Sequence, residues 1–271
     1  MIETASAKIN LALHLRRRRP DGYHDLETVF AFTDFGDTLT AEPAPVLSLT
    51  MAGEYAGPAG AGDDNLVLRA ARALQMRAGI AAGAAIHLEK HIPVAAGLGG
   101  GSADAAAALR LLNRLWGLDW PLDALLPIAA ALGADVPACL LQQTCLGLGR
   151  GDDLSPWPHS LAGAPLLLVN PRVAVATGPV FAGWDRIDLG GIDAGLPLSA
   201  LRNDMTAAAI AIAPVIADVL ALLASTIGAV LVRMSGSGAT CLALYADTAS
   251  RDLAAGVAAN AGWWTAATTI R

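Results

Sequence analysis

A glycine-rich segment carries the clearest chemical signal in this sequence of 271 residues. Four glycines separate a predicted strand from an alanine- and leucine-rich helix: Gly97, Gly99, Gly100 and Gly101. Ser102 follows them at the expected N-cap of that helix. Glycines let the backbone approach an anion closely, and the unpaired N–H groups and the positive dipole end of a helix bind phosphate. A tight connection without a ligand needs fewer glycines, so the segment predicts phosphate binding.

The spacing of these glycines excludes two common nucleotide-binding loops. Ser102 stands where the dinucleotide pattern GxGxxG needs its third glycine. A Walker A loop is excluded because no glycine in the chain precedes a lysine. A dinucleotide-dependent oxidoreductase is therefore disfavoured.

Two further residues have the chemistry to act on a phosphoryl group. Residues 4–15 alternate between polar and apolar, which is typical of a half-buried strand and places Lys8 and Asn10 on one side, roughly 6.6 Å apart. Asp135 follows a helix-stopping Gly133. It could cap a new helix turn or accept a proton as a general base. The alternative for Lys8 is a surface lysine on an edge strand.

The remaining pattern predicts alternating strands and helices around these residues. Strands are expected at 26–32, 38–41, 46–52 and 84–90, and helices at 65–78, 103–116 and 122–132. The stretch 147–158, rich in proline, glycine and aspartate, predicts a domain boundary. Beyond it we expect strands at 165–170, 229–234, 240–245 and 263–270, a short helix after Thr177, helical segments over 204–224 interrupted at Pro214, and a helix at 249–260. The chain is therefore expected to be α+β, with domains 1–153 and 154–271 and a ferredoxin-like second domain.

Composition limits the class of protein. With 54% hydrophobic and 15% charged residues the chain is not disordered, and its net charge of −6 argues against a nucleic-acid partner. No credible membrane helix is present, because the charge-free stretches are broken by prolines or stop short of the ~18 apolar residues needed. Three cysteines without a CxxC pair fit the reducing cytoplasm.

Three motifs together resemble one kinase superfamily. Residues 93–102 read Pro-Val-Ala-Ala-Gly-Leu-Gly-Gly-Gly-Ser, residues 133–137 read Gly-Ala-Asp-Val-Pro, and residues 234–240 read Met-Ser-Gly-Ser-Gly-Ala-Thr. In this order they resemble the GHMP kinases, named for galactokinase, homoserine kinase, mevalonate kinase and phosphomevalonate kinase, over essentially the whole chain. The resemblance implies a ribosomal-protein-S5-like α/β domain, then a ferredoxin-like α+β domain, with the active site in a cleft between them.

The N-terminal motifs narrow this resemblance. Ala5–Leu11 and Arg19–His24 resemble the family member that phosphorylates the 2-hydroxyl of a cytidine-diphosphate-linked sugar alcohol, using ATP and Mg²⁺, in the non-mevalonate route to isoprenoids. The resemblance implies that Asp135 contacts the substrate and accepts its hydroxyl proton. Lys8 would hold Asp135 ionised and offset charge on the transferred group. It also implies a cytoplasmic enzyme that is a monomer or a weak homodimer.

The resemblance also assigns residues to the two ligands. ATP is expected to contact Asn65, Lys90, Pro93, Val94, Ala95, Ala96, Gly97, Leu98, Gly99, Gly100, Gly101, Ser102 and Ala103. The cytidine substrate is expected to contact Asn10, Tyr23, His24, Asp135, Thr177, Phe181, Gly236 and Ser237. Tyr23 would stack on the cytosine and His24 would read its polar edge, with Phe181 closing the other side. Thr177 would cap its helix and meet the diphosphate.

Several alternatives stay open at this point. Phe181 could be an ordinary core residue, and Arg16 and Arg17 are expected to be solvated. The chain could be another GHMP kinase, such as a homoserine or mevalonate kinase. It could also be a non-catalytic nucleotide sensor, which would not need both Lys8 and Asp135.

Overall fold

The computed structural model describes residues 1–271 apart from the side chain of Pro58. Its contacts divide the chain into two compact units that interleave along the sequence. Unit 1 comprises residues 1–8, 36–94 and 99–142, and unit 2 comprises residues 9–35, 95–98 and 143–271. The units differ from the predicted domains 1–153 and 154–271, because the long strands β1 (Ile2–Arg18) and β2 (His24–Ala44) each contribute residues to both.

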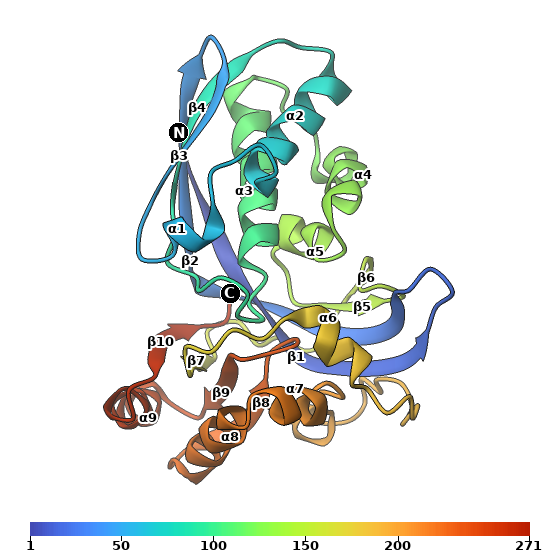
Figure 1. Ribbon diagram of the computed structural model, residues 1–271, viewed down its shortest axis with the longest axis vertical. Coiled ribbons are helices and arrows are strands. Elements are labelled where there is room, and N and C mark those ends of the chain that lie inside the picture. Colours follow the sequence, from blue (N-terminus) through green and yellow to red (C-terminus); the bar gives the residue numbers. More distant parts are fainter. The chain divides into compact units, whose positions relative to one another are not determined.

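Unit 1 is a sheet with helices gathered on one of its faces (Figure 1). Within it β2 pairs with β4 (Gly83–Glu89), which pairs in parallel with β3 (Leu47–Ala52), and β1 pairs with β2. The helices are α1 (Ala56–Ala59), α2 (Leu66–Ala78), α3 (Gly100–Leu115), α4 (Leu122–Leu132) and α5 (Val136–Leu141). The alanines of α3 are buried, and their small side chains let α2 and α5 pack closely against it.

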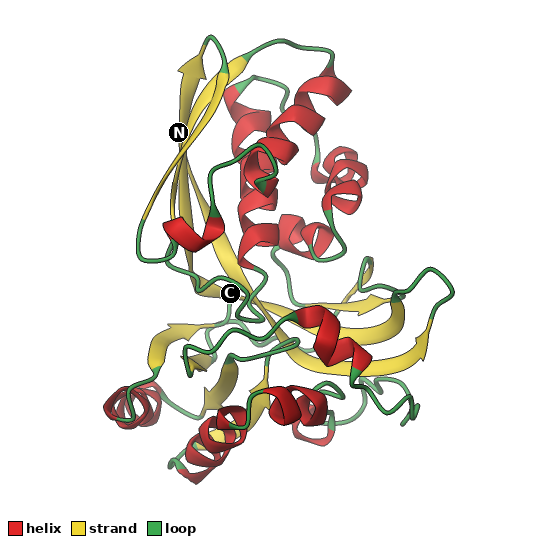
Figure 2. Ribbon diagram, in the orientation of Figure 1, coloured by secondary structure: helices red, strands yellow, loops and turns green.

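Unit 2 contains a four-stranded antiparallel sheet in the order β10–β7–β9–β8. Figure 2 shows the strands of the protein in yellow and its helices in red. Its strands are β7 (Pro165–Asn170), β8 (Ala229–Met234), β9 (Cys241–Tyr245) and β10 (Trp264–Thr269). Its helices are α6 (Thr177–Ala182), η1 (Leu198–Ala200), α7 (Thr206–Ile212), α8 (Val215–Ser225) and α9 (Thr248–Asn260). The order β-α-β-β-α-β along the chain confirms the predicted ferredoxin-like α+β class.

Two short strands lie where the sequence predicted a boundary. β5 (Cys145–Leu148) pairs with residues 28–30 of β2, and β6 (Asp153–Pro156) pairs with β5, all within unit 2. The sequence did not predict this pairing because proline, glycine and aspartate in 147–158 have low strand propensity. Tertiary contacts can override that propensity. The expected boundary loop is therefore a sheet edge.

The start of α3 also differs from the prediction. The helix begins at Gly100, with Gly99 at the N-cap in a left-handed conformation (φ 63°), so Ser102 is the third helical residue and not the cap. The sequence predicted a start at Ala103 because glycine has low helix propensity. Packing of the helix overrides this low propensity at Gly100 and Gly101. None of the helices described has the length and apolar composition needed to cross a bilayer.

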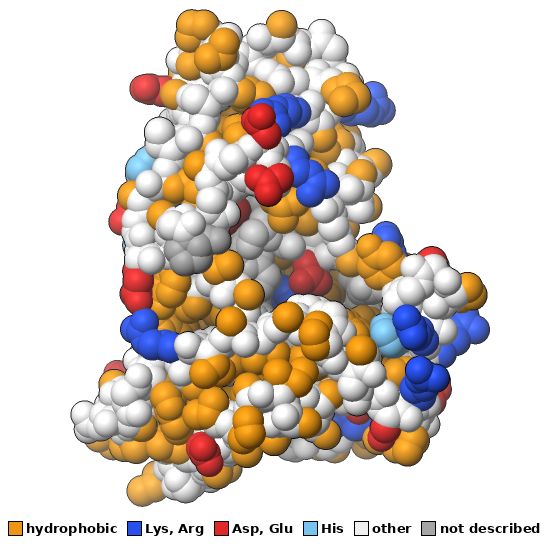
Figure 3. All heavy atoms as spheres, in the orientation of Figure 1, with side chains coloured by type: hydrophobic (Ala, Val, Ile, Leu, Met, Phe, Trp, Pro, Cys, Tyr) orange, Lys and Arg blue, Asp and Glu red, His pale blue; other side chains and the backbone are white. Residues whose placement is uncertain are grey.

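On the face shown in Figure 3, charged side chains are scattered among apolar and neutral ones. This agrees with the 15% of charged residues in the chain. Ionisable groups that the fold buries are therefore unusual features of this protein.

Candidate active site

The N-terminus of α3 offers unpaired amides to an anion. The first helical hydrogen bond runs from the Ala103 N–H to the Gly99 carbonyl at 2.8 Å. The amides of residues 99–102 consequently have no partner within the helix. They stand at the positive end of the helix dipole, which is the arrangement that binds phosphate.

Both lysines of the chain lie against this helix start. A Cβ atom on Gly99 would lie 2.9 Å from Lys8 Cε and 3.9 Å from Asp135 Oδ2. A Cβ atom on Gly100 would lie 3.1 Å from Ile92 Cγ2 and 3.4 Å from Lys90 Nζ. The two glycines therefore let the helix start lie directly between two clusters of charge.

The first cluster is an ion pair that is open to solvent. Lys8 Nζ lies 3.0 Å from Asp135 Oδ2, with the lysine side chain 5% exposed and the aspartate side chain 36% exposed. This confirms the predicted pairing of the two side chains. Asp135 stands at the N-cap position of α5, yet its side chain makes no capping hydrogen bond. The alternative that Asp135 serves as a helix cap is therefore wrong.

The second cluster is sealed inside unit 1. Lys90 Nζ donates to Asp104 Oδ2 at 2.7 Å and pairs with Asp37, and the three side chains are 3%, 6% and 0% exposed. Burial disfavours charge on Lys90, but the two carboxylates outweigh it and raise the pKa of the ammonium. The predicted contact of Lys90 with ATP stays a prediction, and two of the three N–H donors of its ammonium point to Asp37 and Asp104.

Asn65 has a structural task at the start of α2. Its Oδ1 accepts from the Val67 N–H at 2.8 Å, and its Nδ2 donates to the Gly60 carbonyl at 2.6 Å. This is a helix N-cap, which stabilises the exposed end of the helix. Its contact with the nucleotide stays a prediction.

In unit 2, the middle of the glycine-rich segment packs on the loop after β8. The Gly97 carbonyl accepts from Ser235 Oγ at 2.8 Å, and the Thr240 N–H donates to the Ala96 carbonyl at 3.2 Å. Gly97 has φ +77°, and a Cβ there would lie 2.4 Å from the Ser235 carbonyl oxygen. Glycine is required because two backbones touch at this point.

Most predicted substrate residues also belong to unit 2. Asn10 is buried, with its Nδ2 donating to Thr28 Oγ1 at 2.7 Å and its Oδ1 facing Gly236. The Thr177 and Ser237 hydroxyls lie 3.0 Å apart. Thr177 does not cap α6 as predicted, since the N-cap position is Ala176 and makes no side-chain bond.

The aromatic residues contact one another, and their contacts with the cytosine stay a prediction. His24 stacks on Phe181, with ring centroids 4.8 Å apart, and meets Trp184 edge-on at 5.8 Å. Phe181 also packs against the core of unit 2, so the core alternative is partly right. Tyr23 is 54% exposed and lies under the Arg150 guanidinium, 5.4 Å from the ring centroid.

Trp184 and Arg150 are residues that the sequence analysis missed. Trp184 stands three residues after Phe181, a spacing that brings two side chains to one face of a helical turn. That spacing was a usable signal. Arg150 had none, because its position over Tyr23 depends on the β5–β6 hairpin and on its ion pair with Asp152.

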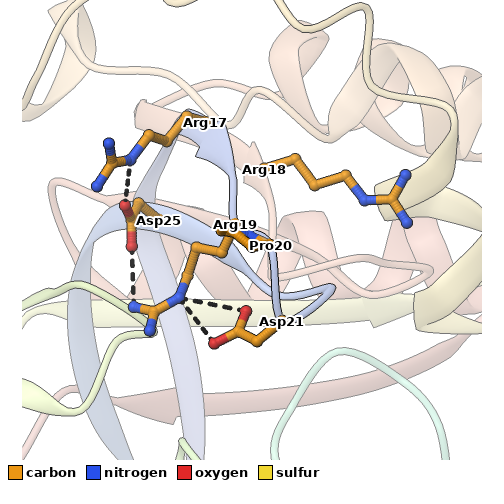
Figure 4. Close-up of a pocket in the computed structure, with 6 residues that line it drawn as sticks. All are labelled: Arg17, Arg18, Arg19, Pro20, Asp21 and Asp25. Atoms are coloured by element: carbon orange, nitrogen blue, oxygen red, sulfur yellow. Dashed lines mark hydrogen bonds and ion pairs between the residues drawn. The ribbon is translucent and has the colours of Figure 1, made fainter.

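A cavity of about 630 Å³ opens at the hairpin between β1 and β2 (Figure 4). Its lining residues are Arg17, Arg18, Arg19, Pro20, Asp21 and Asp25. Asp25 accepts from Arg17 at 2.6 Å and from Arg19 at 3.1 Å, whereas Arg18 points away from this carboxylate (Figure 4). Arg16 pairs with Glu27 at 2.9 Å. Arg17 is exposed as expected, with a side chain 79% accessible, whereas Arg16 is only 33% exposed and is held in its ion pair.

The Arg18 charge acts on His24. Burial, and secondly the positive charge of Arg18, lower the pKa of the His24 imidazole. His24 is consequently neutral at physiological pH, with one nitrogen that donates and one that accepts. Such a ring can read the polar edge of a base.

Metal-binding clusters are not a feature of the described part of the chain. No group of three or more histidine, cysteine or acidic residues there could hold a metal ion. Cys139, Cys145 and Cys241 are buried free thiols.

Two family models match the chain. The model described as GHMP kinases N terminal domain matches residues 65–143, and the GHMP kinases C terminal model matches residues 185–262. These matches cover the helix start in unit 1 and the loop after β8 in unit 2. The fold and the site thus define a GHMP kinase.

Curated relatives and a solved structure agree on one branch of that class. Proteins named 4-diphosphocytidyl-2-C-methyl-D-erythritol kinase from Rhizorhabdus wittichii and Novosphingobium aromaticivorans are 55% and 52% identical, covering 99% of this chain and 94% and 92% of theirs. A crystal structure of 4-(cytidine 5'-diphospho)-2C-methyl-D-erythritol kinase matches with TM-score 0.85 and 34% identity, over 100% of this chain and 99% of that one. The chain belongs to the 4-diphosphocytidyl-2-C-methyl-D-erythritol kinase family of the GHMP kinases.

Proposed function

We propose that this chain transfers the γ-phosphoryl group of ATP to the 2-hydroxyl group of 4-diphosphocytidyl-2-C-methyl-D-erythritol, a step of the non-mevalonate route to isoprenoids. The observation that carries the proposal is the Lys8–Asp135 ion pair beside the unpaired amides of α3. A chain 55% identical to a kinase of that name supports it.

The residues around the helix start fit a triphosphate. Gly99 and Gly100 keep side chains away from the amides of residues 99–102, so the phosphate oxygens can reach those donors. Mg²⁺ is expected to arrive with ATP and to neutralise charge on its phosphate oxygens. We assign no protein ligand to the ion.

Asp135 is the group proposed to take the hydroxyl proton. Its carboxylate is accessible and one oxygen is held by Lys8 at 3.0 Å, which orients the carboxylate. Phosphoryl transfer needs a positioned acceptor for this proton and positive charge near the transferred group. Lys8 supplies that charge, so the pair provides both requirements.

The proposed substrate site uses the polar and aromatic residues of unit 2. Neutral His24 reads the cytosine edge, and Tyr23, Phe181 and the neighbouring Trp184 provide aromatic faces for the base. Asn10, Thr177, Gly236 and Ser237 are proposed to contact the diphosphate and the sugar alcohol. The enzyme is proposed to act in the cytoplasm as a monomer or a weak homodimer.

A direct assay tests the choice of substrate. ATP consumption is measured with 4-diphosphocytidyl-2-C-methyl-D-erythritol, mevalonate and homoserine offered separately. We expect turnover only with the cytidine compound. Turnover with mevalonate or homoserine instead would assign another GHMP activity, and ATP binding without turnover of any of the three would favour a nucleotide sensor.

Tyr23 tests the recognition of the base. Tyr23→Ala should cost ~1–3 kcal/mol of stacking, a rise of roughly 5- to 150-fold in the KM for the cytidine substrate. Tyr23→Phe is the matched control, because it keeps the ring face and should stay close to the parent. The KM for ATP should not change in either variant. An Ala variant with a normal KM for the cytidine substrate would remove Tyr23 from the site.

A further inference from the structure

Three buried ionisable side chains lie directly behind the N-terminus of α3. Lys90 follows β4, Asp37 lies on β2, and Asp104 is the fifth residue of α3. All three belong to unit 1 and are almost completely buried. The proposed phosphoryl transfer uses none of them.

The cluster holds two carboxylates and one ammonium group. The two carboxylates differ in how many hydrogen bonds they accept. Lys90 donates to one oxygen of each. The other oxygen of Asp37 accepts from the His91 and Ile92 amides at 2.6 and 2.8 Å. The other oxygen of Asp104, Oδ1, is buried and has no hydrogen-bond partner among the described residues. A buried anionic oxygen without a donor is costly, so any proton that the cluster takes up belongs on Asp104.

The surroundings of Asp104 offer no second cation in contact with it. Lys90 and Asp37 face it from the ends of β4 and β2. The Cys139 thiol of α5 lies near enough for the Asp104 charge to raise its pKa, as a minor cause after burial and Asp135. On the far side of the helix start Lys8 is already paired with Asp135. With both carboxylates ionised, the buried cluster would carry a net negative charge.

This cluster is adjacent to the proposed phosphate site. A Cβ on Gly100 would lie 3.4 Å from Lys90 Nζ, so the ammonium sits immediately behind the first helical residue. Phosphates bound to the amides of residues 99–102 would therefore bring negative charge close to Asp104. A second negative charge nearby disfavours an ionised carboxylate.

We propose that the Lys90–Asp37–Asp104 cluster is a proton-binding site coupled to the nucleotide, in which Asp104 binds a proton more tightly when the triphosphate of ATP occupies the start of α3. This inference rests on the proposed function, because it requires a nucleotide at residues 99–102. Protonation leaves one carboxylate and one ammonium, a neutral buried pair. By linkage, the proton and the triphosphate each strengthen the binding of the other.

The pKa of Asp104 lies in a range where nucleotide binding can change its protonation. Burial, opposed by Lys90 and assisted by Asp37, raises the pKa of Asp104 to about 8. A unit charge about 10 Å away at an effective dielectric constant of ~20 would raise it by roughly one more unit. Near pH 8.5, binding should then take up about half a proton, and ATP affinity should fall on the order of tenfold between pH 7 and pH 10.

Calorimetry of a non-hydrolysable ATP analogue with Mg²⁺ tests the coupling. Titrations at pH 8.5 in two buffers of different ionisation enthalpy give the number of protons bound per nucleotide. At this pH the phosphates are fully ionised, since their last pKa is near 6. We expect about half a proton for the parent protein and almost none for Asp104→Asn. Asp135→Asn makes the same chemical change in the other cluster and should keep the uptake.

Each outcome decides a separate point. Analogue binding without proton uptake in the parent protein overturns the coupling, as does unchanged uptake in Asp104→Asn. If Asp104→Asn does not fold, the affinity of the parent protein between pH 7 and pH 10 decides, and a flat profile overturns the inference. Failure of the analogue to bind at pH 7 would instead overturn the proposed function, and the coupling with it.

Discussion

The two lysines of this chain make an informative comparison, because both contact aspartate and both lie beside the start of α3. Lys8 pairs with Asp135, whose side chain is 36% exposed. Lys90 is enclosed with Asp37 and Asp104, where nothing exceeds 6% exposure. The same two residue types therefore make an accessible pair in one place and a sealed cluster in the other.

The two clusters differ in solvent exposure and in charge balance, and these differences suit them to different roles. An accessible carboxylate can receive a proton directly from a bound hydroxyl group, whereas a sealed one is out of reach of the substrate. A buried ion pair is costly to form and costly to break. This difference supports the proposed role of Lys8 and Asp135 in phosphoryl transfer and the proposed proton-binding role of the Lys90–Asp37–Asp104 cluster.

The largest expected effect comes from Asp135→Asn. Loss of a positioned general base should lower kcat by ~10²–10⁴. The melting temperature and the affinity for an ATP analogue should stay close to the parent, because the amide oxygen can still accept from Lys8. Steady-state kinetics and thermal unfolding check this. Turnover within a few fold of the parent would show that Asp135 is not the general base. The functional difference proposed between the two clusters would then be contradicted.

Lys90→Met should lower the free energy of unfolding. Removing the ammonium leaves the buried acidic groups of Asp37 and Asp104 without their cation, and breaking a buried ion pair typically costs ~3–5 kcal/mol. Lys8→Met is the matched control, because its partner Asp135 can still reach water. Urea unfolding should show the larger loss of unfolding free energy for Lys90→Met. Equal losses in the two variants would contradict the difference drawn between the clusters.

Gly100→Val tests the role of the helix start in ATP binding without changing the Lys8–Asp135 pair. The added side chain would meet Ile92 and Lys90 and shift the amides that bind phosphate. Loss of a hydrogen bond to a charged group costs ~1.5–3 kcal/mol, so the KM for ATP should rise roughly 10- to 150-fold. The KM for the cytidine substrate should stay near the parent value. An unchanged KM for ATP would exclude this helix start from the nucleotide site.

Counted per pH unit, the smallest expected effect is a pH dependence of stability. Burial raises the pKa of Asp104 from 3.8 to about 8, so between these values the folded state binds a proton that the unfolded state does not. The stability from this group is thus present at low pH and is lost as pH rises toward about 8, by up to ~1.4 kcal/mol per pH unit. Asp104→Asn should flatten this part of the profile in urea unfolding, whereas Asp135→Asn should not. A profile unaffected by Asp104→Asn would contradict the raised pKa.

Local patterns determined most of the elements of this protein. The period of two over residues 4–15 placed Lys8 on β1, and helix 122–132 and strands 165–170 and 229–234 lie where the sequence predicted them. These features depend on side-chain alternation, helix stops and turn residues, which act over a few neighbouring positions. The glycine-rich segment and Asp135 were recognisable for the same reason.

Only the tertiary structure decided what each charged and aromatic residue does. Asp37 lies 53 positions from Lys90 and Asp104 lies 14 positions from it, so no local pattern could show that Lys90 is sealed. The stacking of His24 on Phe181 likewise joins distant segments. Burial and charge balance arise from residues that meet only after folding, and they set the cost of an ion and its access to a ligand. The sequence alone thus determined most of the elements, and the fold decided which lysine is sealed and which one pairs with an accessible aspartate.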